Sequence, residues 1–276
     1  KDQSRQTDVK FISASEPEYV FSAQDCRHST LYMEKRAVKG EPTVFSETFE
    51  YTSCGEWHNL RAEDVQPYDT ATALYKEYTA EREKHIIFSP RLRELAAKLT
   101  AGENNPYLKA KRIFRWVNDN FPWASAREYS TIENIPEYVL DNRHGDCGQV
   151  SLLFITLCRI SGIPAHFQSG FMMHPRAWNL HDWAEVYFEG VGWVPVDQSF
   201  GIPTFACNAD EEYFFMGGID SWRMIVNTDY GMPLVPEKKY PRSETVDFQR
   251  GEVEWEGGNL YFPQWSYHMD IDYLNY

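Results

Sequence analysis

The sequence predicts an α+β fold, in which one buried helix lies beside an antiparallel sheet. Two observations support this prediction. The segment 147–162 has apolar residues at helical spacing, and the segment 165–197 contains three strand-like runs separated by a loop and a tight turn. Strand-like runs near both ends of the chain predict, in addition, a β-rich appendage that is built from both termini.

The first strand-like runs are residues 29–38 and 43–52. Between them lies the segment Lys39-Gly40-Glu41-Pro42, whose composition is typical of a turn. We therefore expect the two runs to form a hairpin.

Helices are expected after this β region. Ser89 and Pro90 begin the first, with serine as the N-cap and proline at the first helical position, and the helix reaches residue 99. Asn105 precedes a second helix over 106–120, and a shorter one is expected over 136–142.

The central helix begins at Cys147. Apolar residues cover all its sides, so we expect it to be buried. Gly162 ends it, and Pro164 follows. The strands expected after it are 165–171, 181–189 and 193–197, with the last two joined by a turn at Gly190-Val191-Gly192.

These elements divide the chain into three regions. Residues 1–67 form an N-terminal β-rich region, residues 68–240 the core, and residues 241–276 a C-terminal set of strands. The C-terminal strands are expected at 251–255, 259–262 and 265–274. We expect them to pair with the N-terminal region.

Composition excludes several classes of protein. The 276 residues carry a net charge of −14, and nucleic-acid binding needs clustered Lys and Arg instead. Hydrophobic residues make up 42% of the chain, which excludes a disordered protein. No apolar run reaches the length of about 18 residues that a membrane-spanning helix needs. The chain starts at Lys1, which fits a processed secretory protein or a trimmed chain, and we expect an extracytoplasmic location, periplasmic or secreted.

No two of the five cysteines have the CxxC spacing, so we expect no structural zinc site. His144 and His174 together with His181 and Asp182 are a weak alternative, since no pair has the spacing of ligands on one helix face. We expect neither a metal nor a cofactor.

Cys147 is the candidate nucleophile. At the start of a helix, its sulfur faces unpaired backbone N–H groups and the positive end of the helix dipole. Both effects favour the thiolate, so we expect a lowered thiol pKa.

A cysteine nucleophile needs a base and a group that orients the base. His181 begins one strand of the predicted hairpin and Asp197 ends the other, and an even number of residues separates them. In a regular register both side chains project to one face within reach of each other. A shift by one residue would separate them, and a surface histidine beside a strand-end aspartate is the alternative.

Three segments resemble the transglutaminase-like superfamily, which has a papain-like fold. The nucleophile segment of that family is similar to Arg143-His144-Gly145-Asp146-Cys147 and, after an apolar helix, to Ser161-Gly162-Ile163-Pro164-Ala165. Its histidine strand is similar to His181-Asp182-Trp183-Ala184-Glu185-Val186-Tyr187, and its aspartate strand to Gly192-Trp193-Val194-Pro195-Val196-Asp197.

The resemblance covers about residues 85–205 and implies a Cys–His–Asp triad of the bacterial transglutaminase-like cysteine protease type. Cys147 would be the nucleophile, His181 the base and Asp197 the orienting group. The chain departs from the family at Asp182, where a small residue is usual, and at Gln198, where proline is usual. Asp182 either favours a cationic group or faces solvent.

Further candidates lie around the triad. The backbone N–H of Cys147 and the indole of Trp123 are candidate oxyanion donors, with core packing as the alternative for Trp123. Trp183 is a candidate cleft wall, and Glu185 is expected to form a supporting ion pair.

The chemistry expected is acyl transfer from a peptide or glutamine-type amide through a thioester, with a protein or peptide as substrate. We favour hydrolysis over cross-linking, and a deglycosylating amidase remains open. The competing class is a catalytically idle glycan- or peptide-binding protein that uses the aromatic-rich β region, since 16% of the residues are aromatic. The sequence does not determine the oligomeric state.

Overall fold

The computed structural model describes residues 2–125, 127–261 and 264–274. Its centre is a four-stranded antiparallel sheet in the order β10-β6-β7-β8. The strands are β6 (Ala165–Met172), β7 (Asn179–Phe188), β8 (Gly192–Val196) and β10 (Arg223–Thr228). The predicted α+β class is therefore confirmed.

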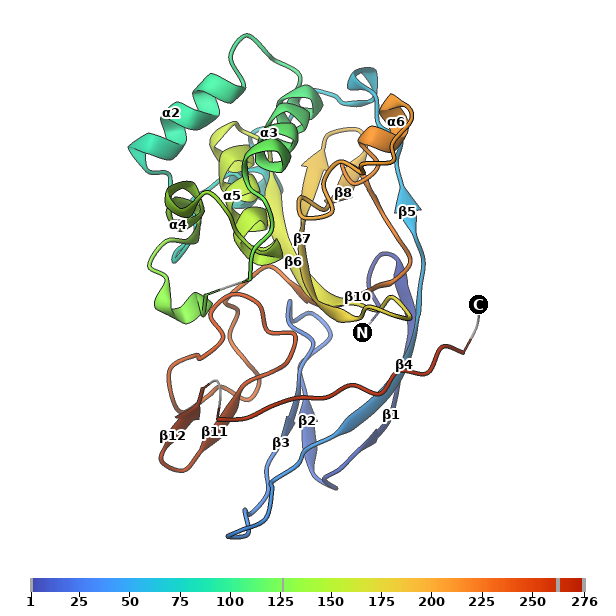
Figure 1. The fold of residues 1–276 in the computed structure, drawn as a ribbon, viewed down its shortest axis with the longest axis vertical. Coiled ribbons are helices and arrows are strands. Elements are labelled where there is room, and N and C mark those ends of the chain that lie inside the picture. The colour runs from blue at the N-terminus through green and yellow to red at the C-terminus, as the bar shows by residue number, and fades with distance from the viewer. Residues whose placement is uncertain (1, 126, 262–263, 275–276) are drawn as a thin grey trace.

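Helix α5 (Cys147–Ile160) packs against one face of this sheet and is buried from Gly148 to Arg159, as its all-round apolar sequence predicts. Three further helices surround it, and Figure 1 shows them together in the upper left of the molecule. They are α2 (Pro90–Leu99), α3 (Pro106–Asn120) and α4 (Ile135–Asn142). The core of the protein lies between these helices and the sheet.

The starts of α2 and α3 agree with the sequence. The Ser89 hydroxyl accepts a hydrogen bond from the Leu92 N–H, and the Asn105 side chain accepts one from the Leu108 N–H. Each cap satisfies an N–H group that the first turn leaves without a partner. Short elements connect the core: η1 (Ala62–Asp64), α1 (Ala73–Tyr78), η2 (Tyr129–Thr131) and α6 (Ala209–Glu212).

The predicted N-terminal hairpin is wrong. Strand β4 (Glu47–Ser53) pairs with β1 (Gln6–Ala14), and β3 (Leu31–Met33) pairs with β2 (Tyr19–Phe21). The turn-like segment 39–42 therefore does not close a hairpin but joins β3 of one pair to β4 of the other. The short strand β5 (Glu56–Trp57) reaches the core and pairs with β9 (Gly218–Ile219).

The predicted pairing of the two termini is also wrong for the described residues. Strand β11 (Val253–Trp255) pairs with β12 (Gly258–Leu260) in the expected hairpin and not with an N-terminal strand. The N-terminal strands already hydrogen-bond each other. Residues 264–274 form no strand, although they run across the lower half of Figure 1, and Phe262 of the predicted strand lies outside the described residues.

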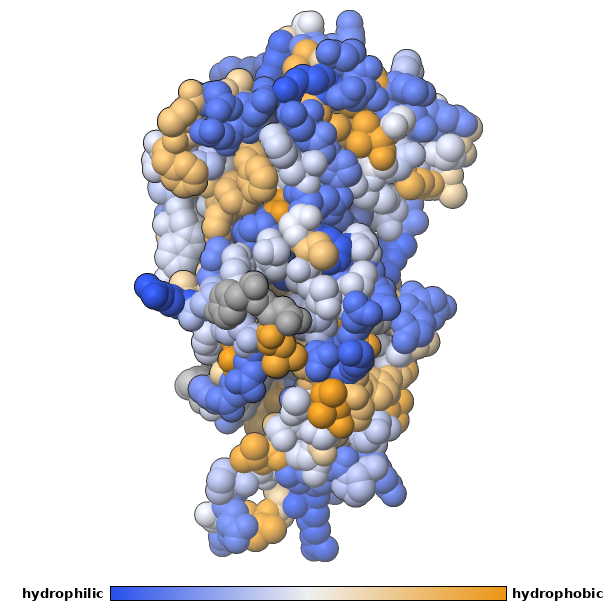
Figure 2. Space-filling model, turned by 90° about the vertical axis from the view of Figure 1, so that its right-hand side faces the viewer, coloured by the Kyte–Doolittle hydropathy of each residue, from blue (hydrophilic) through white to orange (hydrophobic). Residues whose placement is uncertain are grey.

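The surface in Figure 2 is mostly hydrophilic, with small hydrophobic groups scattered among hydrophilic ones. This agrees with the net charge of −14. In the described part of the chain, no helix combines the length and the apolar composition that crossing a bilayer requires.

Candidate active site

Cys147 is the first residue of α5, and Asp146 before it is the N-cap. The Asp146 carboxylate accepts from the Gln149 N–H at 3.0 Å, and the Gln149 side chain accepts from the Asp146 N–H at 3.2 Å. This capping box determines where the helix begins. Cys147 therefore lies at the N-terminal end of a buried helix, as expected, and it is half-buried.

His181 and Asp197 lie together at the end of the hairpin. Because Ala184 pairs with Val196, the register is the regular one. The Nε2 atom of His181 lies 2.7 Å from Asp197 Oδ2, and both residues are buried. The predicted contact is confirmed, and the ring nitrogen Nδ1 is left for another partner.

Asp197 is held by several donors. The Arg223 guanidinium, fully buried, lies 3.2 Å from Asp197 Oδ2, and the N–H groups of Ser199 and Phe200 donate to Oδ1 at 3.2 and 3.1 Å. Burial raises the pKa of Asp197, but His181 and Arg223 outweigh burial and lower the pKa to about 2. The carboxylate is therefore ionised at neutral pH beside the imidazole.

The Cys147 thiol has an unexpected partner. It donates a hydrogen bond to Asp182 Oδ2, and the sulfur–oxygen distance is 3.4 Å. Burial, Asp182 and Asp146 together raise the pKa of Cys147 well above its usual value. The expected lowering of the thiol pKa is therefore wrong for this arrangement, because burial and two nearby carboxylates oppose a negative sulfur.

Asp182 is itself 2% exposed, so the interpretation in which it faces solvent is wrong. Its side chain points to the α5 side of β7, and its Oδ1 atom accepts from Gln249 Nε2 at 2.6 Å. Burial, Asp247 and Asp146 raise the pKa of Asp182 well above its usual value.

Two further acidic residues lie on the C-terminal side of this site. Burial raises the pKa of Asp247 to about 7 and that of Glu244 to about 8, although Arg250 lowers both. Because these folded pKa values exceed those of the unfolded chain, the two carboxyl groups bind extra protons in the folded protein, and their contribution to the free energy of unfolding falls as pH rises from about 4 to about 8.

Replacing Asp247 with asparagine is therefore expected to raise the melting temperature more at pH 8 than at pH 5. Each kcal/mol recovered corresponds to about 2–4 °C in a protein of this size. Thermal melts at both pH values measure the difference, with Asp270→Asn as a control, since Asp270 is 97% exposed. An equal shift at the two pH values would contradict this account.

The other predicted residues are dispersed. Trp123 is 62% exposed, so core packing is wrong for it, and a bridge to Gly145 keeps it near the start of α5. Trp183 is fully buried and donates its indole N–H to Gln168 at 2.6 Å, so it is not a wall of an open cleft. Glu185 lies 3.3 Å from His166, the expected kind of supporting pair.

Sequence reasoning missed three contributors to the site: Arg223, Gln249 and Tyr129. The Tyr129 hydroxyl donates to Asp146. Gln249 is 67 residues from Asp182, in a region that we expected to pair elsewhere. No spacing pattern marks these residues, because they come to the site from distant segments. Within the described residues, no group of three or more His, Cys, Asp or Glu side chains is placed to hold a metal ion.

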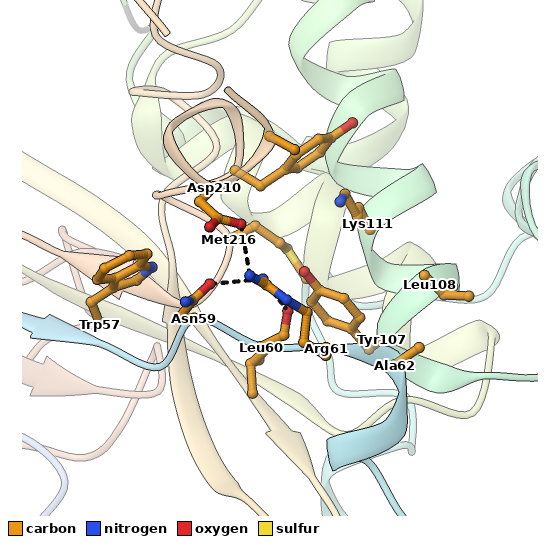
Figure 3. A pocket seen from close by; sticks show the side chains of 12 residues that line it. Trp57, Asn59, Leu60, Arg61, Ala62, Tyr107, Leu108, Lys111, Asp210 and Met216 are labelled. Atoms are coloured by element: carbon orange, nitrogen blue, oxygen red, sulfur yellow. Dashed lines mark hydrogen bonds and ion pairs between the residues drawn. The ribbon is translucent and has the colours of Figure 1, made fainter. Parts of the chain in front are cut away.

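A separate pocket of about 380 Å³ is lined by Tyr107, Leu108 and Lys111 near the start of α3 (Figure 3). Arg61 lies within it between Asp210 and Asn59, at 2.9 and 2.7 Å. None of the residues that line it is Cys147, His181 or Asp197.

The buried helix α5 packed against the four-stranded antiparallel sheet defines a papain-like α+β core. Residues 93–198 match the model of the transglutaminase-like superfamily, so this segment is a transglutaminase-like domain and the resemblance seen in the sequence is confirmed. A solved structure described as "a Putative Cysteine Protease from Cytophaga hutchinsonii" shares the fold. Its TM-score is 0.56 at 19% identity, covering 82% of this chain and 72% of that one.

Two curated proteins are similar over less than half of this chain. The chain is 27% identical over 129 residues to "Uncharacterized protein YebA" of Bacillus subtilis, covering 40% of this chain and 18% of that protein. It is 23% identical over 125 residues to "Protein-glutamine gamma-glutamyltransferase" of Pseudomonas aeruginosa, covering 41% and 19%. The chain spans less than a fifth of the length of either relative.

Proposed function

We propose that this protein is a thiol-dependent acyl-transfer enzyme that acts on peptide or glutamine-type amide bonds. Cys147 is the nucleophile, His181 the base and Asp197 the group that orients the base. The observation that carries the proposal is the hydrogen bond between His181 Nε2 and Asp197, together with the contact between the Cys147 thiol and Asp182, the residue next to His181. With Nε2 engaged, Nδ1 is the nitrogen that receives the thiol proton.

The reaction proceeds in two steps. The S–H proton moves to His181 Nδ1, the sulfur attacks the carbonyl carbon, and the C–N bond breaks as His181 gives its proton to the leaving amine. The resulting thioester is then released by water or by a second amine. The Cys147 N–H and the exposed Trp123 indole are the proposed donors to the oxyanion.

We propose hydrolysis as the main outcome, on protein or peptide substrates in an extracytoplasmic location. A library of glutamine-containing peptides is incubated with and without a fluorescent primary amine, and the products are identified by mass spectrometry. Cleaved or deamidated peptides are expected to exceed amine adducts, and the Cys147→Ala variant is expected to give neither. Adducts in excess would make the protein a transferase, and equal products from the variant would contradict the proposal.

One observation favours binding as a second candidate function. Phe11, Tyr19 and Phe21 form a ring cluster with centroids 5.0 to 5.4 Å apart. Tyr19 and Phe21 are 41% and 48% exposed, a surface on which sugars or peptides can stack. Ligand affinity that survives Cys147→Ala but is lost in Phe21→Ala would favour this function.

A further inference from the structure

The resting contact of the Cys147 thiol is with a carboxylate and not with the imidazole. The thiol donates a hydrogen bond to Asp182 Oδ2. Asp182 is the residue next to His181 on β7, and its side chain projects to the helix side of the strand. An S–H group that donates to a carboxylate is stabilised as the thiol, because the thiolate would place two negative charges in contact.

The space for this carboxylate is created by Gly148. A Cβ atom at residue 148 would lie 2.7 Å from Asp182 Oδ2 and 2.5 Å from the Tyr129 hydroxyl. Any other amino acid there would therefore collide with both groups. The absence of a side chain at Gly148 therefore leaves the room that the Asp182 carboxylate occupies.

The second oxygen of Asp182 is fixed from outside the domain that the family model matches. Gln249 Nε2 donates to Asp182 Oδ1 at 2.6 Å and to the His181 carbonyl at 3.4 Å, and Gln249 is 8% exposed. Each oxygen of Asp182 accepts a hydrogen bond, and these two bonds favour the ionised carboxylate, although burial, Asp247 and Asp146 together raise its pKa. The titratable and charged groups that face it are Cys147 of α5, the N-cap Asp146, Tyr129 of η2, and Asp247 near Gln249.

We propose that Asp182 is a positioning residue that keeps Cys147 as a protonated thiol in the resting enzyme, and that Gln249 maintains this contact. The inference rests on the proposed function for its role in catalysis. Attack requires the S–H group to leave Asp182 and turn toward His181. The S–H bond then breaks, an N–H bond forms at Nδ1, and the electron pair stays on sulfur. The partial burial of Cys147 and its raised pKa agree with this resting state.

The test measures the rate at which iodoacetamide alkylates Cys147, followed by mass spectrometry of its peptide across a pH series. In the wild type, the rate is expected to be half-maximal above the ordinary thiol pKa of about 8.5. In Asp182→Asn, which keeps the shape and removes the charge, we expect alkylation at pH 7 to be about tenfold faster or more, which corresponds to one pH unit. Glu185→Gln is the matched control, since Glu185 is a buried carboxylate of the same strand that pairs with His166 instead, and it is expected to keep the wild-type profile.

Cys158 reports on folding in the same samples, because it is fully buried and reacts only when the chain opens. If it becomes reactive in Asp182→Asn, the Gln249→Ala variant decides, and alkylation of Cys147 several-fold faster than in the wild type is expected there. A wild-type midpoint at or below the ordinary value, or variants that match the wild type, would overturn the inference. Alkylation needs no substrate, so an inactive protein with the expected shift would remove the proposed function and leave this inference standing.

Discussion

Replacement of Cys147 by alanine is expected to lower kcat/KM by about 10⁴-fold or more on the best peptide from the library. The thioester needs a sulfur nucleophile, and loss of the nucleophile removes the covalent pathway entirely. Folding is expected to persist, because the side chain is half-buried at a helix end and the capping box of Asp146 and Gln149 stays intact.

The matched control for this variant is Cys207→Ala. Cys207 is an exposed free thiol, and alanine there is expected to leave kcat/KM within about twofold of the wild type. Steady-state kinetics on both variants, with melting curves to confirm folding, separate the roles of the two thiols. A Cys147→Ala variant that retains turnover would mean that the chemistry occurs elsewhere.

Replacement of Asp197 by asparagine is expected to reduce kcat/KM by about 10³- to 10⁴-fold, an effect of the size seen when a triad carboxylate is lost. The carboxylate accepts from His181 Nε2 at 2.7 Å and so holds the tautomer in which Nδ1 can take the thiol proton. An amide can donate to Nε2 and favour the opposite tautomer. An activity within tenfold of the wild type would remove Asp197 from the mechanism.

Asp197 also has a structural role that alanine would reveal. Its carboxylate lies 3.2 Å from the fully buried Arg223, and removal of one partner of a buried ion pair costs about 3–5 kcal/mol. The pKa of Asp197 is lowered to about 2, so its contribution is present above the unfolded value of about 4 and is lost as pH falls through about 2. The drop in melting temperature is therefore expected to be equal at pH 6 and pH 8.

The Asp220→Asn variant separates stability from activity. Asp220 lies 2.8 Å from Arg223 and is partly exposed, so its loss is expected to cost stability through the same arginine. It leaves the contact between His181 and Asp197 unchanged, and the loss of kcat/KM is expected to be far smaller than in Asp197→Asn. Similar kinetic losses in the two variants would mean that Arg223, rather than the His181 tautomer, carries the effect.

Local sequence was sufficient for the elements of the core. A capping side chain followed by proline begins α2 and α3 where expected, since a cap and its first turn are neighbours in sequence. The contact between His181 and Asp197 could also be predicted from the sequence, because a tight turn sets the register of the two strands that it joins.

Strand pairing outside the core could not be obtained in this way. The strands β1 and β4 are separated by more than thirty residues, and several partners satisfy an isolated strand equally well. The choice depends on which side chains the assembled surfaces bury. For the same reason, the position of the C-terminal segment, which brings Gln249 to Asp182, has no local signal.

The sequence by itself determined the α+β core, the helix that begins at Cys147 and the strand positions of His181 and Asp197, because these features depend on contacts between chain neighbours. Only the tertiary structure decided the electrostatic state of the nucleophile. The helix end that favours a thiolate is local, whereas burial in the folded core and Asp182, which oppose the thiolate, depend on other segments of the chain. Charge interactions act through space, so the state of Cys147 depends on the folded arrangement of groups that are far apart along the chain.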